Sequence, residues 1–93
     1  NLIKALWLSK KQKNMLIFAK ILSKLVDLYA NNNQHNKIIL LSEQYEDEIY
    51  SLINRNTKVI LKLIYSLLEF DYDYTKNLIN KLLNKKGDST YED

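Results

Sequence analysis

Apolar residues recur along this chain at steps of three and four positions, the spacing that places them on one face of an α-helix. The clearest example covers residues 10–30, which are predicted to form one helix about 30 Å long at 1.5 Å per residue. Its core positions are expected to be Met15, Phe18, Leu22, Leu25 and Tyr29. Further apolar residues widen the stripe, so this helix is expected to contact neighbours on more than one side.

Two features bracket this long helix. Residues 1–8 are mostly apolar, with one lysine at Lys4, and are predicted to form a short helix of their own. Ser9 is predicted to be the N-cap of the long helix, because Gln12 stands three residues later as in a capping box. After the helix, the Asn-rich stretch 31–36 predicts a loop, since Asn side chains compete with helical hydrogen bonds.

The middle of the chain is predicted to hold one further helix. The apolar run 38–41 is expected to form a helical turn, and Ser42 is expected to cap a helix that ends near Arg55. Acidic residues at the start of that helix would complement the positive end of its dipole. These residues are Glu43, Glu46, Asp47 and Glu48.

The last part of the chain predicts a hairpin of two helices. The first helix is expected to run from a cap at Asn56 or Thr57 to about Phe70. After a corner of acidic and aromatic residues, Asp73 is expected to cap the second helix. The core face of this helix is expected to be Leu78, Ile79, Leu82 and Leu83. Gly87 is expected to end that helix in a left-handed conformation.

Turn-forming residues are too few for a sheet protein. Sheets reverse direction at frequent Gly, Pro or Asn-Gly turns, whereas this chain has no Pro and one Gly. The predicted fold is therefore all-α, a four- to five-helix bundle with a C-terminal helical hairpin. A chain of 93 residues has room for one core, so residues 1–87 are predicted to be a single domain and residues 88–93 a flexible acidic tail.

Composition and charge narrow the function classes. The chain has 14 basic and 11 acidic residues, a net charge of +3 and a single arginine, whereas dedicated DNA-binding domains are usually more basic and richer in Arg. The absence of Cys excludes disulfides and thiolate metal sites and suits a protein inside the cell. The abundance of Lys, Asn, Ile and Tyr is typical of AT-rich genomes. No apolar run approaches the roughly 20 residues that a transmembrane helix needs.

No set of residues predicts an enzyme. His35 is the only histidine and lies in the predicted Asn-rich loop, where a solvated side chain is expected. A calcium loop starting at Asp71 would need Gly at its sixth position and Glu at its twelfth, where the chain has Lys76 and Leu82. No Gly-rich loop is present to hold phosphate. We therefore expect a non-catalytic protein that uses neither a cofactor nor a metal.

The N-terminal segment holds the residues that best fit partner binding. Trp7 is expected either to dock on the bundle or to anchor a partner, as Trp often does at interfaces. Lys10, Lys11 and Lys13 follow it and make this region basic. Such residues also suit stacking on bases and contact with phosphates. Against nucleic acid, lysines that point several ways around a helix usually form solvated surface, and no reading motif follows.

The stretch 56–83 resembles a known helical family. The segments that carry the resemblance are Leu67-Leu68-Glu69-Phe70-Asp71-Tyr72, then Tyr74-Thr75-Lys76-Asn77-Leu78-Ile79, then Leu82. This pattern is similar to the helical domain shared by steroid receptor RNA activator protein and the C-terminus of the outer-cage subunit of the COPII vesicle coat. The chain departs from it in a longer segment over 31–52, in Thr75 where the family has Ala, and in lacking the family's later Trp-containing segment.

The resemblance implies a non-catalytic helical bundle that makes protein–protein contacts in the coat of vesicles travelling from the endoplasmic reticulum (ER) to the Golgi. It transfers no binding residues. The leading hypothesis is therefore a protein-interaction domain of a vesicle-coat subunit, in the cytoplasm at ER exit sites. The main alternative is a pathogen surface or exported domain that binds a host ligand outside the cell. Nucleic-acid binding is the third hypothesis.

Overall fold

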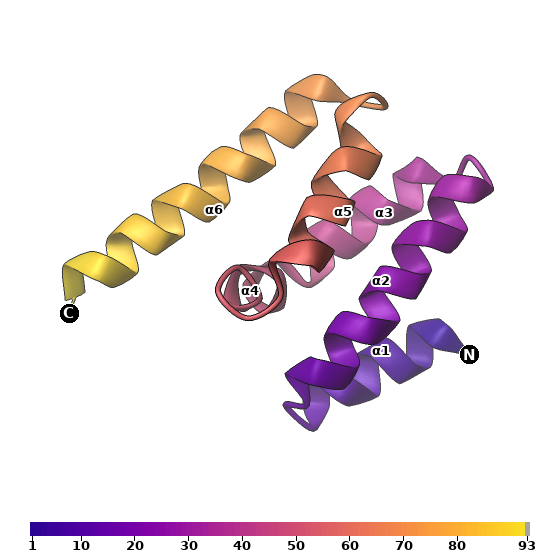
Figure 1. The fold of residues 1–93 in the computed structure, drawn as a ribbon, viewed down its shortest axis with the longest axis horizontal. Coiled ribbons are helices and arrows are strands. Elements are labelled where there is room, and N and C mark those ends of the chain that lie inside the picture. The colour runs from indigo at the N-terminus through magenta and orange to yellow at the C-terminus, as the bar shows by residue number, and fades with distance from the viewer. Residues whose placement is uncertain (93) are drawn as a thin grey trace.

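Six helices and no strand make up residues 1–92, the part of the backbone that the structure, a computed structural model, describes; side chains are described for residues 1–84. The helices are α1 (Leu2–Lys11), α2 (Met15–Asn31), α3 (His35–Gln44), α4 (Glu46–Ser51), α5 (Thr57–Leu68) and α6 (Tyr72–Glu92) (Figure 1). The predicted all-α bundle with a C-terminal helical hairpin is confirmed. The Cα atoms span 41 × 33 × 19 Å, so the molecule is about two helices thick and keeps many side chains near solvent.

The first two helices form a hairpin whose corner lies further along the chain than predicted. α1 continues through Ser9, whose buried hydroxyl donates to the Leu6 carbonyl at 2.7 Å, so the predicted cap at Ser9 is wrong. Asn14 caps α2 instead, and its side-chain oxygen accepts from the Ile17 amide at 3.2 Å. The corner depends on Lys13, whose φ of 56° lies in the left-handed region that few residues other than Gly and Asn occupy.

The Asn-rich loop is shorter than predicted. Residues 32–34 alone connect α2 and α3, with Asn33 left-handed at φ 57°, and α3 starts at His35. Ser42, predicted as an N-cap, lies inside α3 with a fully buried side chain that donates to the Ile39 carbonyl at 2.7 Å. A Ser inside a helix satisfies its hydroxyl in this way at the preceding turn, which is why it can be mistaken for a cap.

The helix predicted over the acidic residues is short and separate. α3 ends at Gln44, Tyr45 breaks the helical path, and α4 has only six residues. The Tyr45 side chain is buried and packs edge-on against Phe18, with the ring centroids 5.5 Å apart. Three acidic residues occupy the first turn of α4, where they complement the helix dipole as expected.

In the C-terminal hairpin, the N-cap of α5 is one of the two predicted residues, whereas the N-cap of α6 is a different residue from the predicted one. Asn56 caps α5, and its side-chain oxygen accepts from the Val59 amide at 3.3 Å. Asp71, rather than Asp73, caps α6, because its carboxylate accepts from the Tyr74 amide at 3.0 Å. The corner between the two helices therefore closes two residues earlier than predicted.

α6 is longer than predicted and leaves the other helices toward its C-terminal end (Figure 1). The stop predicted at Gly87 is wrong, because the helix continues through it to Glu92. The backbone over 88–92, predicted to be a tail, is thus helical. The side chains of residues 85–92 and the whole of residue 93 lie outside the described part of the structure. The predicted division into a domain over residues 1–87 and a flexible tail over 88–93 therefore stays a prediction.

α2 is the central helix of the bundle. It contacts α1, α3 and α5, and α6 packs on the outer side of α5. Lys62 of α5 also reaches α2, with its Nζ 2.8 Å from both the Asp27 carboxylate and the Ser23 hydroxyl. The core is apolar, and its fully enclosed residues are Leu6, Phe18, Leu22, Val26, Ile38, Ile49, Leu63 and Leu67.

Candidate functional site

The residues predicted to bind a partner reach two different sets of neighbours; they are Trp7, Lys10, Lys11 and Lys13. The Trp7 side chain is 43% exposed, and the Lys11 Nζ lies 4.9 Å from the centroid of its ring. The Lys10 Nζ instead lies 5.5 Å from the centroid of the Tyr45 ring. Lys13 shares a pocket wall with Lys10. Trp7 and Lys11 therefore form one pair, and Lys10 and Lys13 another.

The second pair faces acidic residues of α4. Lys10 and Lys13 line an open pocket of 570 Å³ together with Asp47, Glu48 and Arg55. Opposite charges in one pocket wall offset each other, so this pocket attracts an anionic partner only weakly. Lys11, which lies over Trp7, is not among the residues that line the pocket.

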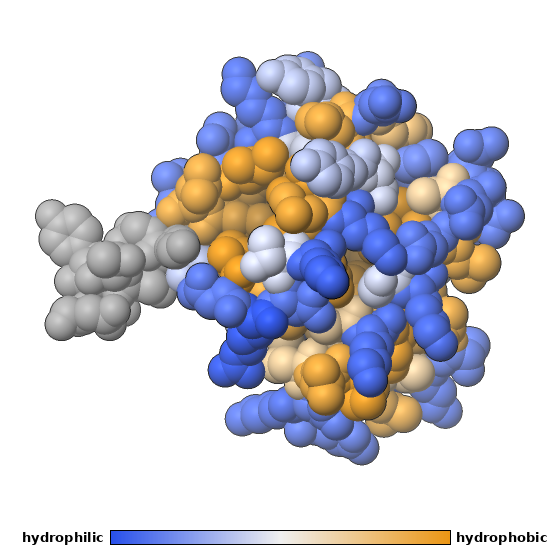
Figure 2. Space-filling model, viewed as in Figure 1, coloured by the Kyte–Doolittle hydropathy of each residue, from blue (hydrophilic) through white to orange (hydrophobic). Residues whose placement is uncertain are grey.

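A different surface, which we call the hairpin groove, lies between α5 and α6. Its lining residues are all Ile or Leu, namely Ile53, Ile60, Ile64, Ile79, Leu82 and Leu83. Figure 2 shows apolar side chains gathered beside the point where α6 leaves the other helices. The groove has a volume of 140 Å³, below the roughly 300–1,000 Å³ of small-molecule pockets. Its size and composition suit an apolar side chain of another macromolecule.

The floor of the hairpin groove belongs to the core, whereas its rim does not. Ile60 and Leu82 are 6% and 4% exposed, but Leu83 is 60% exposed. Successive residues of a helix point about 100° apart, so Leu82 packs toward α5 while Leu83 stands at the edge. Covering that edge would be favourable by about 25 cal/mol for each Å² of apolar surface removed from water.

Sequence reasoning missed this groove because it assigned the apolar residues of the last helix to one core face. The expectation for Leu83 was wrong, since most of its side chain is exposed. A signal was present in the two adjacent pairs Leu78-Ile79 and Leu82-Leu83. They make a stripe wider than a helix needs when it packs against a single neighbour.

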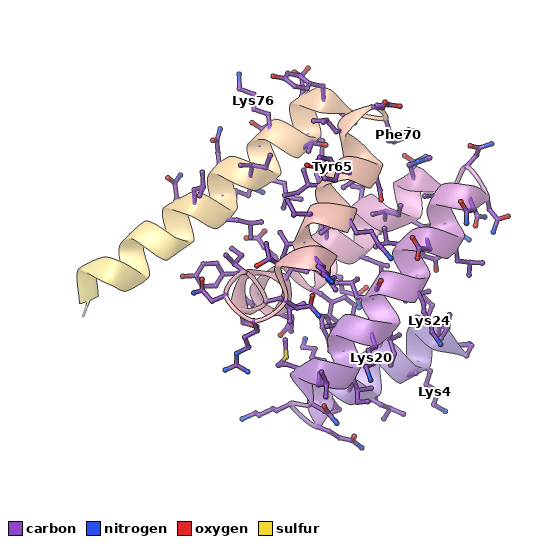
Figure 3. All side chains as sticks on the ribbon, in the orientation of Figure 1. Lys4, Lys20, Lys24, Tyr65, Phe70 and Lys76 are labelled. Atoms are coloured by element: carbon purple, nitrogen blue, oxygen red, sulfur yellow. The ribbon has the colours of Figure 1, made fainter. Side chains whose placement is uncertain are left out.

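Aromatic side chains gather at the corner between α5 and α6. His35, predicted to be a solvated loop residue, is half-buried in α3, and its ring stacks on Phe70 with centroids 4.9 Å apart and planes 14° apart. Both residues line a 460 Å³ pocket together with Tyr65 and Glu69. Figure 3 shows Tyr65 and Phe70 near this corner, where Tyr65 is 66% exposed. The stack holds the corner against the start of α3.

Two tyrosine hydroxyls have shifted pKa values. Burial raises the pKa of Tyr45 above its usual 10.0, and the charge of Glu48 raises it further. Burial also raises the pKa of Tyr74, and three nearby carboxylates raise it further. Those carboxylates are Glu43, Glu46 and Asp71. Both hydroxyls stay protonated at neutral pH, so neither is suited to act as a general base.

The Tyr74 hydroxyl connects α6 to α3. Ser42 has one hydroxyl proton and donates it to the Ile39 carbonyl. In the bond between Ser42 and Tyr74, the Tyr74 hydroxyl is therefore the donor. This bond occupies the Tyr74 hydroxyl and gives it a structural function.

Within the described part of the chain, no three His, Cys, Asp or Glu side chains come close enough to hold a metal ion. None of the helices in that part is long and apolar enough to cross a bilayer. No protein-family model, curated protein or solved structure matches the chain.

Proposed function

We propose that this chain is a non-catalytic protein-interaction domain whose hairpin groove receives an apolar side chain from a partner protein. The observation that carries the proposal is the lining of the groove, which consists of Ile and Leu alone. Single exposed apolar side chains are common on monomeric proteins, whereas this groove brings six aliphatic side chains together around one hollow. With Leu83 60% exposed at the rim, the groove is accessible to such a partner.

The surroundings of the groove favour a helix as the partner segment. An extended peptide gains affinity mainly by adding its backbone to an exposed strand edge, and residues 1–92 contain no strand. A helix can instead lay its side-chain ridges into the space between two others, at an interaxial distance of about 8–10 Å. A partner helix along α5 and α6 would therefore place one apolar residue against Leu82 and Leu83.

The resemblance of residues 56–83 to the COPII outer-coat family supports a more specific proposal. The residues that carry the resemblance lie on α5, on α6 and in the corner between them. Thr75, which stands where the family has Ala, is 0% exposed, and its hydroxyl donates to the Asp71 carbonyl at 2.8 Å. Because position 75 is fully buried, it requires a small side chain, and both Thr and Ala meet that requirement. We therefore propose a domain of a vesicle-coat subunit that acts in the cytoplasm at ER exit sites.

A charged residue at the rim of the hairpin groove tests two things: whether the groove is the contact surface, and whether the chain acts as part of a vesicle coat. Leu83→Glu places a carboxylate at a mostly exposed position and is expected to leave the fold intact. Leu40→Glu is the matched control, because Leu40 is 62% exposed and lies on α3. Each tagged chain is followed by fluorescence microscopy in the cells that make this protein. We expect the wild type and Leu40→Glu to collect at ER exit sites and Leu83→Glu to lose most of that signal.

Two results would contradict the proposal at different levels. If both variants collect at ER exit sites as well as the wild type, the hairpin groove is not the contact surface. If the wild-type chain does not reach these sites and is found at the cell surface, the coat proposal fails and the exported, host-binding alternative is favoured.

A further inference from the structure

α1 has an outward face that is chemically different from the hairpin groove. Leu6 and Ser9 are 0% and 4% exposed and mark the inner side of the helix, which packs on α2. On the rest of its surface, Ile3, Trp7 and Leu8 are 44%, 43% and 40% exposed. A helix of ten residues thus keeps three large apolar side chains in contact with water.

Two lysines lie among these apolar side chains. Lys4 and Lys11 stand three and four residues from Trp7, so they share its side of the helix, and both are exposed. The Lys11 Nζ lies over the indole ring, 4.9 Å from its centroid.

No acidic side chain of residues 1–84 forms an ion pair with Lys4 or Lys11. The first acidic residue in the chain is Asp27, which pairs with Lys62 of α5 at 2.8 Å. Asp47 and Glu48 of α4 line a pocket with Lys13 and with Lys10, whose Nζ lies over the Tyr45 ring. The outward face of α1 is therefore apolar and cationic at once.

We infer that this face, made of Ile3, Lys4, Trp7, Leu8 and Lys11, binds the surface of an anionic lipid bilayer with α1 lying in the interface. Trp favours the headgroup level, aliphatic side chains enter slightly deeper, and Lys stems extend back toward lipid phosphates. A nucleic acid would engage the lysines and the indole but would leave Ile3 and Leu8 in water. The aliphatic residues are what favour a bilayer.

This inference does not rest on the proposed function. The hairpin groove lies between α5 and α6, whereas the membrane-binding face belongs to α1. Leu83→Glu is therefore expected to bind vesicles as the wild type does, and failure of one proposal leaves the other standing.

The single tryptophan of the chain makes the test direct, because all tryptophan fluorescence comes from Trp7. The 93-residue chain is titrated with vesicles of phosphatidylcholine, with vesicles that also contain phosphatidylserine, and with a single-stranded oligonucleotide. We expect the emission to move to shorter wavelength with the anionic vesicles alone. Added salt should weaken this response because it screens the lysines.

Charge reversals show whether the lysines of this face are responsible. The test variant combines Lys4→Glu with Lys11→Glu, and its control combines Lys58→Glu with Lys76→Glu, which changes the net charge equally at two exposed positions on α5 and α6. One lysine close to an anionic surface strengthens partitioning about fivefold. The test variant should therefore bind at least about 25-fold more weakly, and the control should stay within about fivefold of the wild type. Far-UV circular dichroism checks that each variant is folded.

Several results would overturn the inference. An emission that does not respond to anionic vesicles, or that responds equally to neutral ones, would exclude an anionic bilayer as the partner. An equal loss of vesicle binding in the two charge-reversed variants would show that binding depends on the net charge of the chain and not on this face. A response to the oligonucleotide without one to vesicles would assign the face to nucleic acid.

Discussion

Replacing Leu67 by Ala is expected to remove a large part of the stability of this domain. Leu67 lies on α5 and is 0% exposed. Truncating a fully buried Leu to Ala costs about 2–5 kcal/mol, because apolar contact is lost and a cavity remains. At about 0.05–0.15 kcal/mol per residue, a domain of this length has roughly 5–14 kcal/mol in total. The substitution would therefore remove a substantial fraction of the free energy of unfolding.

The stability loss at Leu67 is to be compared with the losses at two other leucines, one buried and one exposed. Leu82→Ala should cost about as much as Leu67→Ala, since Leu82 is 4% exposed in α6. Leu83 is 60% exposed, so less than half of its side chain is buried, and Leu83→Ala should cost about 1 kcal/mol or less. Urea unfolding followed by circular dichroism measures all three. With an m-value of about 1–3 kcal/mol/M, a loss of about 3 kcal/mol lowers the midpoint by roughly 1–3 M.

The pattern across the three positions decides whether the reasoning holds. Losses below about 0.5 kcal/mol at both Leu67 and Leu82 would refute the described packing of α5 against α6, since such values are typical of surface substitutions. A loss at Leu83 as large as the one at Leu67 would refute the assignment of Leu83 to the exposed rim of the hairpin groove.

Two further predictions concern a helix cap and two tyrosines. Asp71→Ala should cost about 1 kcal/mol as the loss of an N-cap, whereas Asp73→Ala should stay within about 0.5 kcal/mol; thermal unfolding measures both, and equal losses would contradict the cap. Because the pKa values of Tyr45 and Tyr74 are raised above 10.0 in the folded state, the unfolded chain ionises first as the pH rises. The stability linked to them is present below about pH 10 and is lost above it. Urea unfolding between about pH 8 and pH 11 should show this fall, Tyr74→Phe should reduce it, and a pH-independent midpoint would count against it.

The fold could be predicted in outline because its main signal is local. The stripe of α2 was identified from spacing alone, and Phe18, Leu22, Leu25 and Tyr29 are buried in the structure. The cap of α5 was predicted to be Asn56 or Thr57, and Asn56 is the one whose side chain caps the helix. A polar residue directly before an apolar repeat has few other functions. The absence of Pro and the single Gly indicated helices for a physical reason, namely that sheets need turns.

The boundaries could not be predicted as well, because a short polar side chain fits more than one place in a helix. Ser9 and Ser42 precede helical sequence as caps do, yet both are buried inside helices and bonded to carbonyls one turn earlier. Asp71 and Asp73 are equally good caps by sequence, and the geometry of the corner selects the first. Gly87 fits a stop signal, but a single Gly costs a helix only about 1 kcal/mol.

The candidate surfaces depend on tertiary packing, which periodicity does not contain. Lys10 and Lys11 are adjacent in sequence, but one approaches Tyr45 and the other Trp7. The exposure of Leu83 follows from how α6 is rotated against α5, and no local pattern fixes that rotation. Sequence reasoning therefore located Trp7 as a candidate contact but could not separate its neighbours or detect the hairpin groove.

A photo-crosslinking side chain at position 83 tests the central claim most directly, namely that the hairpin groove receives a partner helix. The crosslinker is placed at position 83 or, as a control, at position 40, and is activated in the cells that make this protein. Mass spectrometry then identifies the attached peptides. The account predicts that position 83 crosslinks to a helical segment of a coat subunit and that position 40 does not. No crosslink from position 83, or the same products from both positions, would contradict it.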